Sequence, residues 1–251
     1  FVATQRLIQE TSPSAQVATI GPAGERLVRL AGIINDAPQG RAAARGGMGA
    51  VMGSKNLKAI VVKGEKRPFV ADAPRLKAAT TPFLHRLNRI KAGEYGPLPQ
   101  ISASVGRSQD IGGLPVKNWT GARFDSFVQR VAKFEHGPRL YCHSCAVGCH
   151  ESFSTPDREQ REMTGHHLVP LGANCLIDDL EALQQAYSLC QGYGLDSISV
   201  GACISFAMEC YEKGLLTLED TGGIDLRFGN HEAMLQLIPM VARREKFGDR
   251  L

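Results

Sequence analysis

The sequence lacks several patterns that would assign it to a class at once. No apolar run in its 251 residues is long enough to span a bilayer, and no segment has the pattern of a secretory signal. Internal repeats and low-complexity tracts are missing as well. Hydrophobic residues make up 43% and charged residues 22%, as in an ordinary globular protein whose core needs no disulfide staples. We therefore expect no membrane span.

Nucleic-acid-binding motifs are also missing. Aromatic residues make up only 6% of the chain, and the basic residues are scattered without aromatic residues between them. The net charge of +4 hides an asymmetry, because residues 1–139 carry 21 basic and 9 acidic side chains, whereas residues 140–251 carry 8 and 16. A basic half suits a polyanionic partner, such as a phosphorylated cofactor, a nucleic acid or the acidic half. Without a recognised motif we expect no nucleic acid.

Cysteine is absent from the first 141 residues. All seven cysteines lie between Cys142 and Cys210. An odd number with tight local spacing argues against a secreted disulfide framework and favours a metal site in a reducing compartment. We therefore expect a cytoplasmic protein.

Hydrophobic patterning predicts an α+β fold. Residues 15–34 suggest two short strands around a turn at Gly21–Gly24, and residues 58–63 suggest another strand. Helical spacing follows in residues 74–92, 178–192 and 197–213, with a long loop expected over residues 93–120. We expect a strand-containing part over residues 1–68 and a mainly helical domain over residues 69–251.

The strongest chemical signal is a C-x2-C-x3-C loop formed by Cys142, Cys145 and Cys149. Three thiolates at this spacing can hold three corners of a [4Fe–4S] cluster. The main alternative is structural zinc with His143 or His150 as the fourth ligand, although no second pair of zinc ligands is visible. The remaining alternative is three buried and inert cysteines.

The other four cysteines have weaker signals. Cys190, Cys203 and Cys210 fall within predicted amphipathic helices, which favours core packing. Cys175 follows a Gly-Ala-Asn loop and is the only candidate within this chain for a fourth cluster ligand.

A glycine-rich segment runs from Arg45 to Lys55. It fits neither the Walker A order nor the dinucleotide-binding fingerprint. Its bare backbone can approach a large flat or phosphorylated ligand, with N–H groups as donors. The alternative is a packed turn between strands.

Five segments together resemble the aldehyde:ferredoxin oxidoreductase family of tungsten- or molybdenum-pterin enzymes, in the family's order. They are residues 20–33, 44–64, 112–119, 142–149 and 192–216. The resemblance implies an internal fragment: the end of a β-rich pterin-binding domain over 1–68, and most of a helical second domain over 69–251. It places the fourth cluster cysteine beyond Leu251, in a third domain.

The resemblance also implies the chemistry. A tungsten or molybdenum ion held by two pterins would oxidise an aldehyde to a carboxylic acid, and a [4Fe–4S] cluster would pass electrons to ferredoxin or an iron–sulfur subunit. Arg45, Gly46, Gly47 and Gly49 would line the pterin. Asp196 would accept hydrogen bonds from it, or would cap a helix, and both roles are compatible. The sequence does not indicate the oligomeric state, and a homodimer is compatible with it.

Two departures from the family pattern concern the substrate. Gln191 stands where the family's pterin loop begins with Asp. Near the metal, where many members carry a Glu, this chain offers His166 and His167, with Glu162 or Glu159 as alternatives for the proton donor. The alternatives to aldehyde oxidation are reduction of an acid or a ring-bearing thioester and, in another class, a zinc-stabilised binding module without catalysis.

Overall fold

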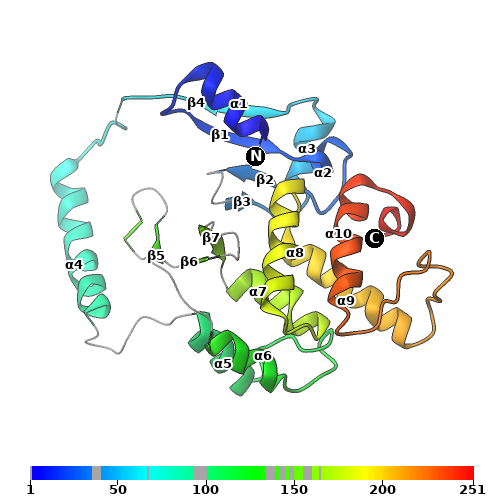
Figure 1. Cartoon of the computed structure of the whole chain (residues 1–251). Coiled ribbons are helices and arrows are strands. Elements are labelled where there is room, and N and C mark those ends of the chain that lie inside the picture. Colours follow the sequence, from blue (N-terminus) through cyan, green and yellow to red (C-terminus); the bar gives the residue numbers. More distant parts are fainter. Residues whose placement is uncertain are drawn as a thin grey trace.

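The computed structural model describes residues 2–35, 41–66, 68–92, 101–133, 139–141, 145–146, 148, 150–154, 160–163 and 165–251. For residues 101–103, 139–140, 150–154, 160–163 and 165–166 the description extends to the backbone only. The chain combines helices with two antiparallel sheets, which confirms the expected α+β class (Figure 1).

A four-stranded sheet near the N-terminus has the order β3-β2-β1-β4. Thr19 of the central strand lies opposite Ile34 on one side and Ala59 on the other. Helix α1 (Val2–Thr11) packs along this strand (Figure 1). The strands are β1 (Gln16–Ile20), β2 (Ile33–Asn35), β3 (Arg41–Ala43) and β4 (Ala59–Val62).

The sequence predicts a turn between two strands at Gly21–Gly24, and this prediction is wrong about the kind of turn. The structure has a single helical turn there, α2 (Pro22–Glu25), with Pro22 at the first position, where its missing N–H costs nothing. Leu27 then adopts a left-handed φ of 58°, so the second strand of this region begins only at Ile33.

Helices predominate among the described residues after residue 100. They are α5 (Ile101–Asp110), α6 (Asp125–Ala132), α7 (Gly165–Leu171), α8 (Leu180–Tyr193), α9 (Ser197–Glu212) and α10 (His231–Arg243), with 3-10 turns η1 (Ala173–Cys175) and η2 (Lys246–Asp249). The side chains in their core include Leu183, Ile204, Met208, Met234, Leu237 and Ile238, each at most 1% exposed. Because burying each contributes roughly 1.5–3 kcal/mol, this core is a main source of stability.

The helices predicted at 178–192 and 197–213 are confirmed as α8 and α9. Each begins after an aspartate that caps it: the carboxylate of Asp179 accepts from the N–H of Ala182 at 3.0 Å, and that of Asp196 accepts from Ser199 at 3.3 Å. Helix α8 ends at Gly194, whose φ of 75° is left-handed.

The loop expected over residues 93–120 is wrong for residues 101–110, which form α5. Val105 of α5 is buried. The side-chain amide of Gln109 connects α5 to α6, because it donates to the carboxylate of Asp125 and accepts from the N–H of Phe124, both at 2.7 Å. These contacts with α6 stabilise a helix in a segment rich in glycine, proline and serine.

Strands also occur beyond residue 68, within the part that the sequence predicts to be mainly helical. A three-stranded antiparallel sheet has the order β5-β6-β7 and consists of β5 (Arg139–Leu140), β6 (His150–Ser154) and β7 (Gln160–Met163). It adjoins the cysteine loop in sequence.

Two further helices complete the chain. Helix α3 (Met48–Ser54) follows the glycine-rich segment. Helix α4 (Ala73–Lys91) confirms the helix predicted at 74–92; it is capped by Asp72 and lies apart from the other helices (Figure 1). None of the described helices is both long and apolar enough to cross a membrane.

Candidate functional site

The segment Arg29–Gly32 is the point where distant parts of the chain meet. Ala31 forms an isolated antiparallel bridge with Leu195. The N–H of Gly32 donates to the carbonyl of Gly194 at 2.9 Å, and the N–H of Asp196 donates to the carbonyl of Leu30 at 2.8 Å. The residues after α8 are therefore held against this segment by main-chain hydrogen bonds.

The glycine-rich segment contacts the same residues. The N–H of Gly49 donates to the carbonyl of Ala31 at 3.0 Å, and a Cβ on Gly47 would lie 2.8 Å from the carbonyl oxygen of Arg29. The structure thus brings two sets of predicted cofactor-binding residues, 45–49 and Asp196, together around residues 29–32.

The glycine-rich segment is neither an open loop nor a turn between strands, because α3 begins at Met48. Before the helix, Arg45, Gly46 and Gly47 have left-handed φ values of 58°, 89° and 72°. Gly49 is buried against backbone, whereas a Cβ on Gly46 would meet no atom within 4 Å. Arg45 and Gly46 are exposed and form the part of the segment that a ligand can approach.

Asp196 is 4% exposed and does cap α9. Its Oδ1 accepts from the N–H of Ile198 at 3.3 Å, and its Oδ2 accepts from the N–H and the hydroxyl of Ser199 at 3.3 and 2.6 Å. A carboxylate offers about four acceptor positions, so one remains for a ligand N–H.

Gln191 supplies an acceptor that needs a donor. Its side chain is 7% exposed, and its buried Oε1 has no hydrogen-bond partner among the described residues. Such an atom destabilises the protein by about 1–3 kcal/mol unless a donor satisfies it. The amino and ring N–H groups of a pterin are donors of this kind, so the unpaired Oε1 of Gln191 and the remaining acceptor of Asp196 each suit such a group. The backbone at Gly46 is open to a ligand.

His167 lies next to the cap of α9. Its Nδ1 is 2.8 Å from the hydroxyl of Ser197, and its ring centroid is 4.5 Å from that of Tyr187. Of the other two candidate proton donors, His166 is the second residue of α7 and Glu162 lies in β7, and for both the description stops at the backbone.

The cysteine loop is described only in part. Cys142 and Cys149 lie outside the described residues, and Cys145 is half-buried. Gly148 has a left-handed φ of 63°, and a Cβ there would lie 2.5 Å from the ring of Tyr141. The described residues hold no group of three or more metal-binding side chains, so the cluster site stays a prediction.

Cys175 has the properties of an inert core residue. It is fully buried in η1, and its thiol donates to the carbonyls of Pro170 and Gly201, both at 3.6 Å. Burial raises the pKa of this thiol to about 12. Because metals bind the thiolate, this environment disfavours Cys175 as a cluster ligand.

The predicted family segment 112–119 packs against the helical core. Lys117, Asn118 and Trp119 have left-handed φ values of 50°, 48° and 64° in succession. The side chain of Asn118 donates to Glu209 at 2.5 Å and accepts from the hydroxyl of Ser205 at 3.2 Å. This network positions the segment without linking it to the residues around 29–32.

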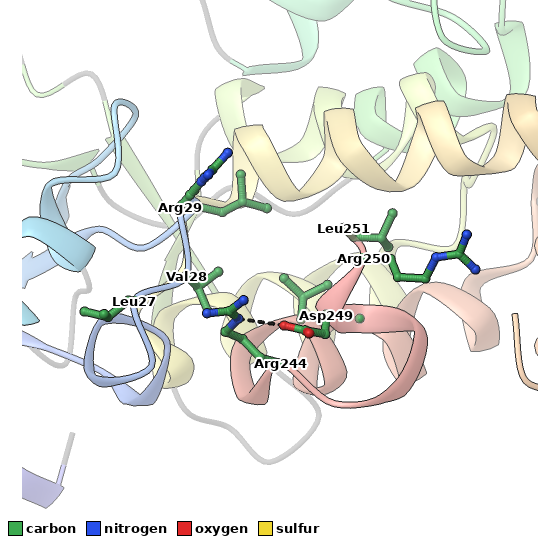
Figure 2. A pocket seen from close by; sticks show the side chains of 10 residues that line it. Leu27, Val28, Arg29, Arg244, Asp249, Arg250 and Leu251 are labelled. Atoms are coloured by element: carbon green, nitrogen blue, oxygen red, sulfur yellow. Dashed lines mark hydrogen bonds and ion pairs between the residues drawn. The ribbon is translucent and has the colours of Figure 1, made fainter. Parts of the chain in front are cut away.

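A cavity of about 450 Å³ lies between residues 27–30 and the end of the chain. Figure 2 shows its lining, with Arg244 paired to Asp249 at 2.6 Å. Arg29 and Arg250 also line it. Sequence reasoning missed this cavity, because its walls are about 200 residues apart and share no motif.

The chain was then compared with known proteins. Residues 1–64 match the family model of the aldehyde ferredoxin oxidoreductase N-terminal domain, and residues 91–251 match that of domains 2 and 3. The chain belongs to the aldehyde ferredoxin oxidoreductase family. This confirms the resemblance on which the sequence predictions rest.

Curated relatives in the family include two tungsten-containing aldehyde ferredoxin oxidoreductases. That of Pyrococcus horikoshii is 36% identical over 98% of this chain and 42% of its own length, and that of Pyrococcus furiosus is 39% identical over 96% and 40%. This chain therefore spans about two fifths of the length of these relatives. Among solved structures, the active-site complex BamBC of benzoyl coenzyme A reductase with 1,5-dienoyl-CoA matches with a TM-score of 0.79 and 28% identity, over 99% of this chain and 40% of that one.

Proposed function

We propose that this chain is part of a tungsten- or molybdenum-pterin oxidoreductase that oxidises an aldehyde to a carboxylic acid. The observation that carries the proposal is the meeting of residues 45–49 and 194–196 at the segment 29–32. In this proposal residues 1–68 end the pterin-binding domain and residues 69–251 form most of the helical domain.

The chain's own residues bind and orient the cofactors. Arg45 and the backbone N–H groups of Gly46 and Gly47 hold the phosphorylated pterin, whereas the N–H of Gly49 is already bonded to Ala31. Asp196 and the buried Oε1 of Gln191 accept hydrogen bonds from the N–H groups of the pterin. Cys142, Cys145 and Cys149 bind the [4Fe–4S] cluster.

When bound, the metal–pterin group would supply two-electron oxidation chemistry, and a cluster held by Cys142, Cys145 and Cys149 would supply one-electron transfer. Protein side chains handle the proton: His167 lies beside Asp196 and Ser197, and His166 and Glu162 are the neighbouring candidates. The electron acceptor is a ferredoxin or an iron–sulfur subunit.

Reduction of a ring-bearing thioester is the second candidate. The solved benzoyl coenzyme A reductase complex, which contains a dienoyl-CoA, supports it by its similarity over almost all of this chain. A histidine at the position where many family members carry Glu is compatible with either direction of reaction.

Elemental analysis of the complete protein, purified without oxygen, tests the cofactor assignment. We expect about four irons and one tungsten or molybdenum per chain. Zinc without iron contradicts it and supports the binding-module alternative. Assays of aldehyde oxidation and of aromatic thioester reduction then distinguish the two activities.

Asp196→Asn tests the site itself. Asparagine is as good a helix cap as aspartate, but it replaces one acceptor oxygen by an N–H donor. We expect the tungsten or molybdenum content to fall while iron and the melting temperature stay close to wild type. Ser199→Ala is the matched control, because it removes a hydrogen bond from the same carboxylate and leaves the charge in place. If the Asp196→Asn variant retained the full tungsten or molybdenum content, Asp196 would not be part of the cofactor site.

A further inference from the structure

The contact between Ser197 and His167 joins α7 to the first residue of α9. The hydroxyl Oγ of Ser197 and the Nδ1 of His167 are 2.8 Å apart, and Ser197 is 2% exposed. Two arrangements satisfy this distance. Either the imidazole N–H donates to the hydroxyl oxygen, or the hydroxyl donates to an unprotonated Nδ1.

Counting donors and acceptors distinguishes the two arrangements. His167 is the only hydrogen-bond partner of the Ser197 side chain among the described residues. If Nδ1–H donated, the hydroxyl proton of a buried serine would have no acceptor, which is costly. If the hydroxyl donates, its proton is paired, Nδ1 is the acceptor, and the neutral ring carries its proton on Nε2.

The titratable groups around the ring are compatible with a neutral imidazole. Burial raises the pKa of the Tyr187 phenol, whose ring contacts that of His167 at a tilt of 34°. It also raises the pKa of the Cys190 thiol, one turn further along α8. Both are therefore uncharged at neutral pH. Among the residues whose side chains are described, the nearby charges are the Asp196 carboxylate, which is held by the N-terminus of α9, and Arg41, which acts on Tyr187.

We infer that Ser197 is a positioning residue: its hydroxyl donates to Nδ1 of His167 and keeps this ring in the neutral form that presents a proton on Nε2. A neutral imidazole with Nε2–H is a hydrogen-bond donor and a source of one proton. The inference rests on the proposed function for its catalytic meaning, because His167 is one of the candidate proton donors there.

Exchange of the Cε1 hydrogen of His167 in deuterated water measures the ionisation of the ring directly. The rate at each pH is measured by mass spectrometry in the complete protein, with fragmentation separating His167 from His166. Because a hydrogen bond to the neutral form disfavours the cation, Ser197→Ala is expected to raise the midpoint of the exchange profile by roughly 0.5–1 pH unit. Ser197→Thr, which keeps the hydroxyl, is expected to restore it.

Ser199→Ala is the matched control, since it removes a hydroxyl from the same first turn without contact to His167. Its midpoint should equal that of the wild type. An unchanged midpoint in Ser197→Ala overturns the inference, and a lowered one shows that Nδ1–H donates to serine instead. The measurement uses no substrate, so its failure is separate from a failure of the proposed function, which metal analysis and the two assays detect.

Discussion

Gly21 and Gly194 touch through their backbones. A Cβ on Gly21 would lie 2.7 Å from the nitrogen of Gly194, and a Cβ on Gly194 would lie 2.6 Å from the nitrogen of Gly21. This contact joins the end of β1 to the end of α8, immediately before the residues that bond to segment 29–32. No side chain fits between the two.

Gly194→Ala is therefore expected to destabilise the protein by about 2–4 kcal/mol, from overpacking and from the φ of 75° that alanine disfavours. Gly192→Ala, inside α8 with no atom within 4 Å, should be neutral or stabilise by up to about 1 kcal/mol. Urea unfolding followed by circular dichroism measures both. Equal effects of the two variants would mean that the contact with Gly21 is unimportant.

Substitution of Cys145 and of Cys175 should have different effects on the iron content. Cys145→Ser is expected to lower the iron bound per chain, because it removes one predicted cluster ligand. Cys175→Ser is expected to retain wild-type iron, since a serine hydroxyl can donate to the same carbonyls of Pro170 and Gly201. Iron analysis and visible absorbance are the measurements. Loss of iron from a folded Cys175→Ser variant would make Cys175 a ligand after all.

Stability should fall at alkaline pH. The Cys175 thiol has an ordinary pKa of 9.0, which burial raises to about 12 in the folded chain. Between these values the unfolded chain has lost a proton that the folded chain retains. The free energy of unfolding therefore decreases as pH rises, by about 1.4 kcal/mol per pH unit for this thiol. Burial raises the pKa of Cys190 as well and adds to the decrease.

Urea midpoints at pH 8, 9, 10 and 11 measure this slope. Cys175→Ser removes one titrating thiol, so its slope should be shallower than that of the wild type. Parallel slopes for the two proteins would contradict the assignment of the decrease to Cys175.

Asn118 combines a strained backbone with two side-chain hydrogen bonds. Asn118→Ala is expected to lower the melting temperature by roughly 5–10 °C, because the bonds to Glu209 and Ser205 are lost and alanine disfavours a φ of 48°. Asn118→Gly loses the same bonds but tolerates the φ, so its decrease should be smaller by a few degrees. Thermal unfolding of both variants tests this order, and a glycine variant no more stable than the alanine variant would refute the role of backbone strain.

The parts of the fold that depend on local signals could be predicted from the sequence. Helices α8 and α9 were predicted because Asp179 and Asp196 cap them and Gly194 ends the first. Helix α5 was missed because the contacts of Gln109 with α6 outweigh a composition typical of loops. The second sheet was missed because its strands are short and polar.

The candidate site could be predicted only as separate motifs. The sequence identified residues 45–49, His167 and Asp196. The meeting of residues 45–49 and Asp196 at segment 29–32, however, depends on main-chain hydrogen bonds between parts that are distant in sequence. Ser197 was overlooked, although it directly follows Asp196. Its importance depends on the position of α7, which no local pattern in the sequence indicates.

The hydrogen bonds from Gly49 to Ala31 and from Asp196 to Leu30 also bear on the sequence in which the two segments reach their place during biosynthesis. Gly49 and Asp196 are about 150 residues apart, and contacts over such separations form late in folding. While the ribosome is still translating the residues between them, residues 45–49 exist but Asp196 does not. If the proposed function is right, a pterin held by residues 45–49 and Asp196 is inserted after α9 has docked, as a late step of maturation.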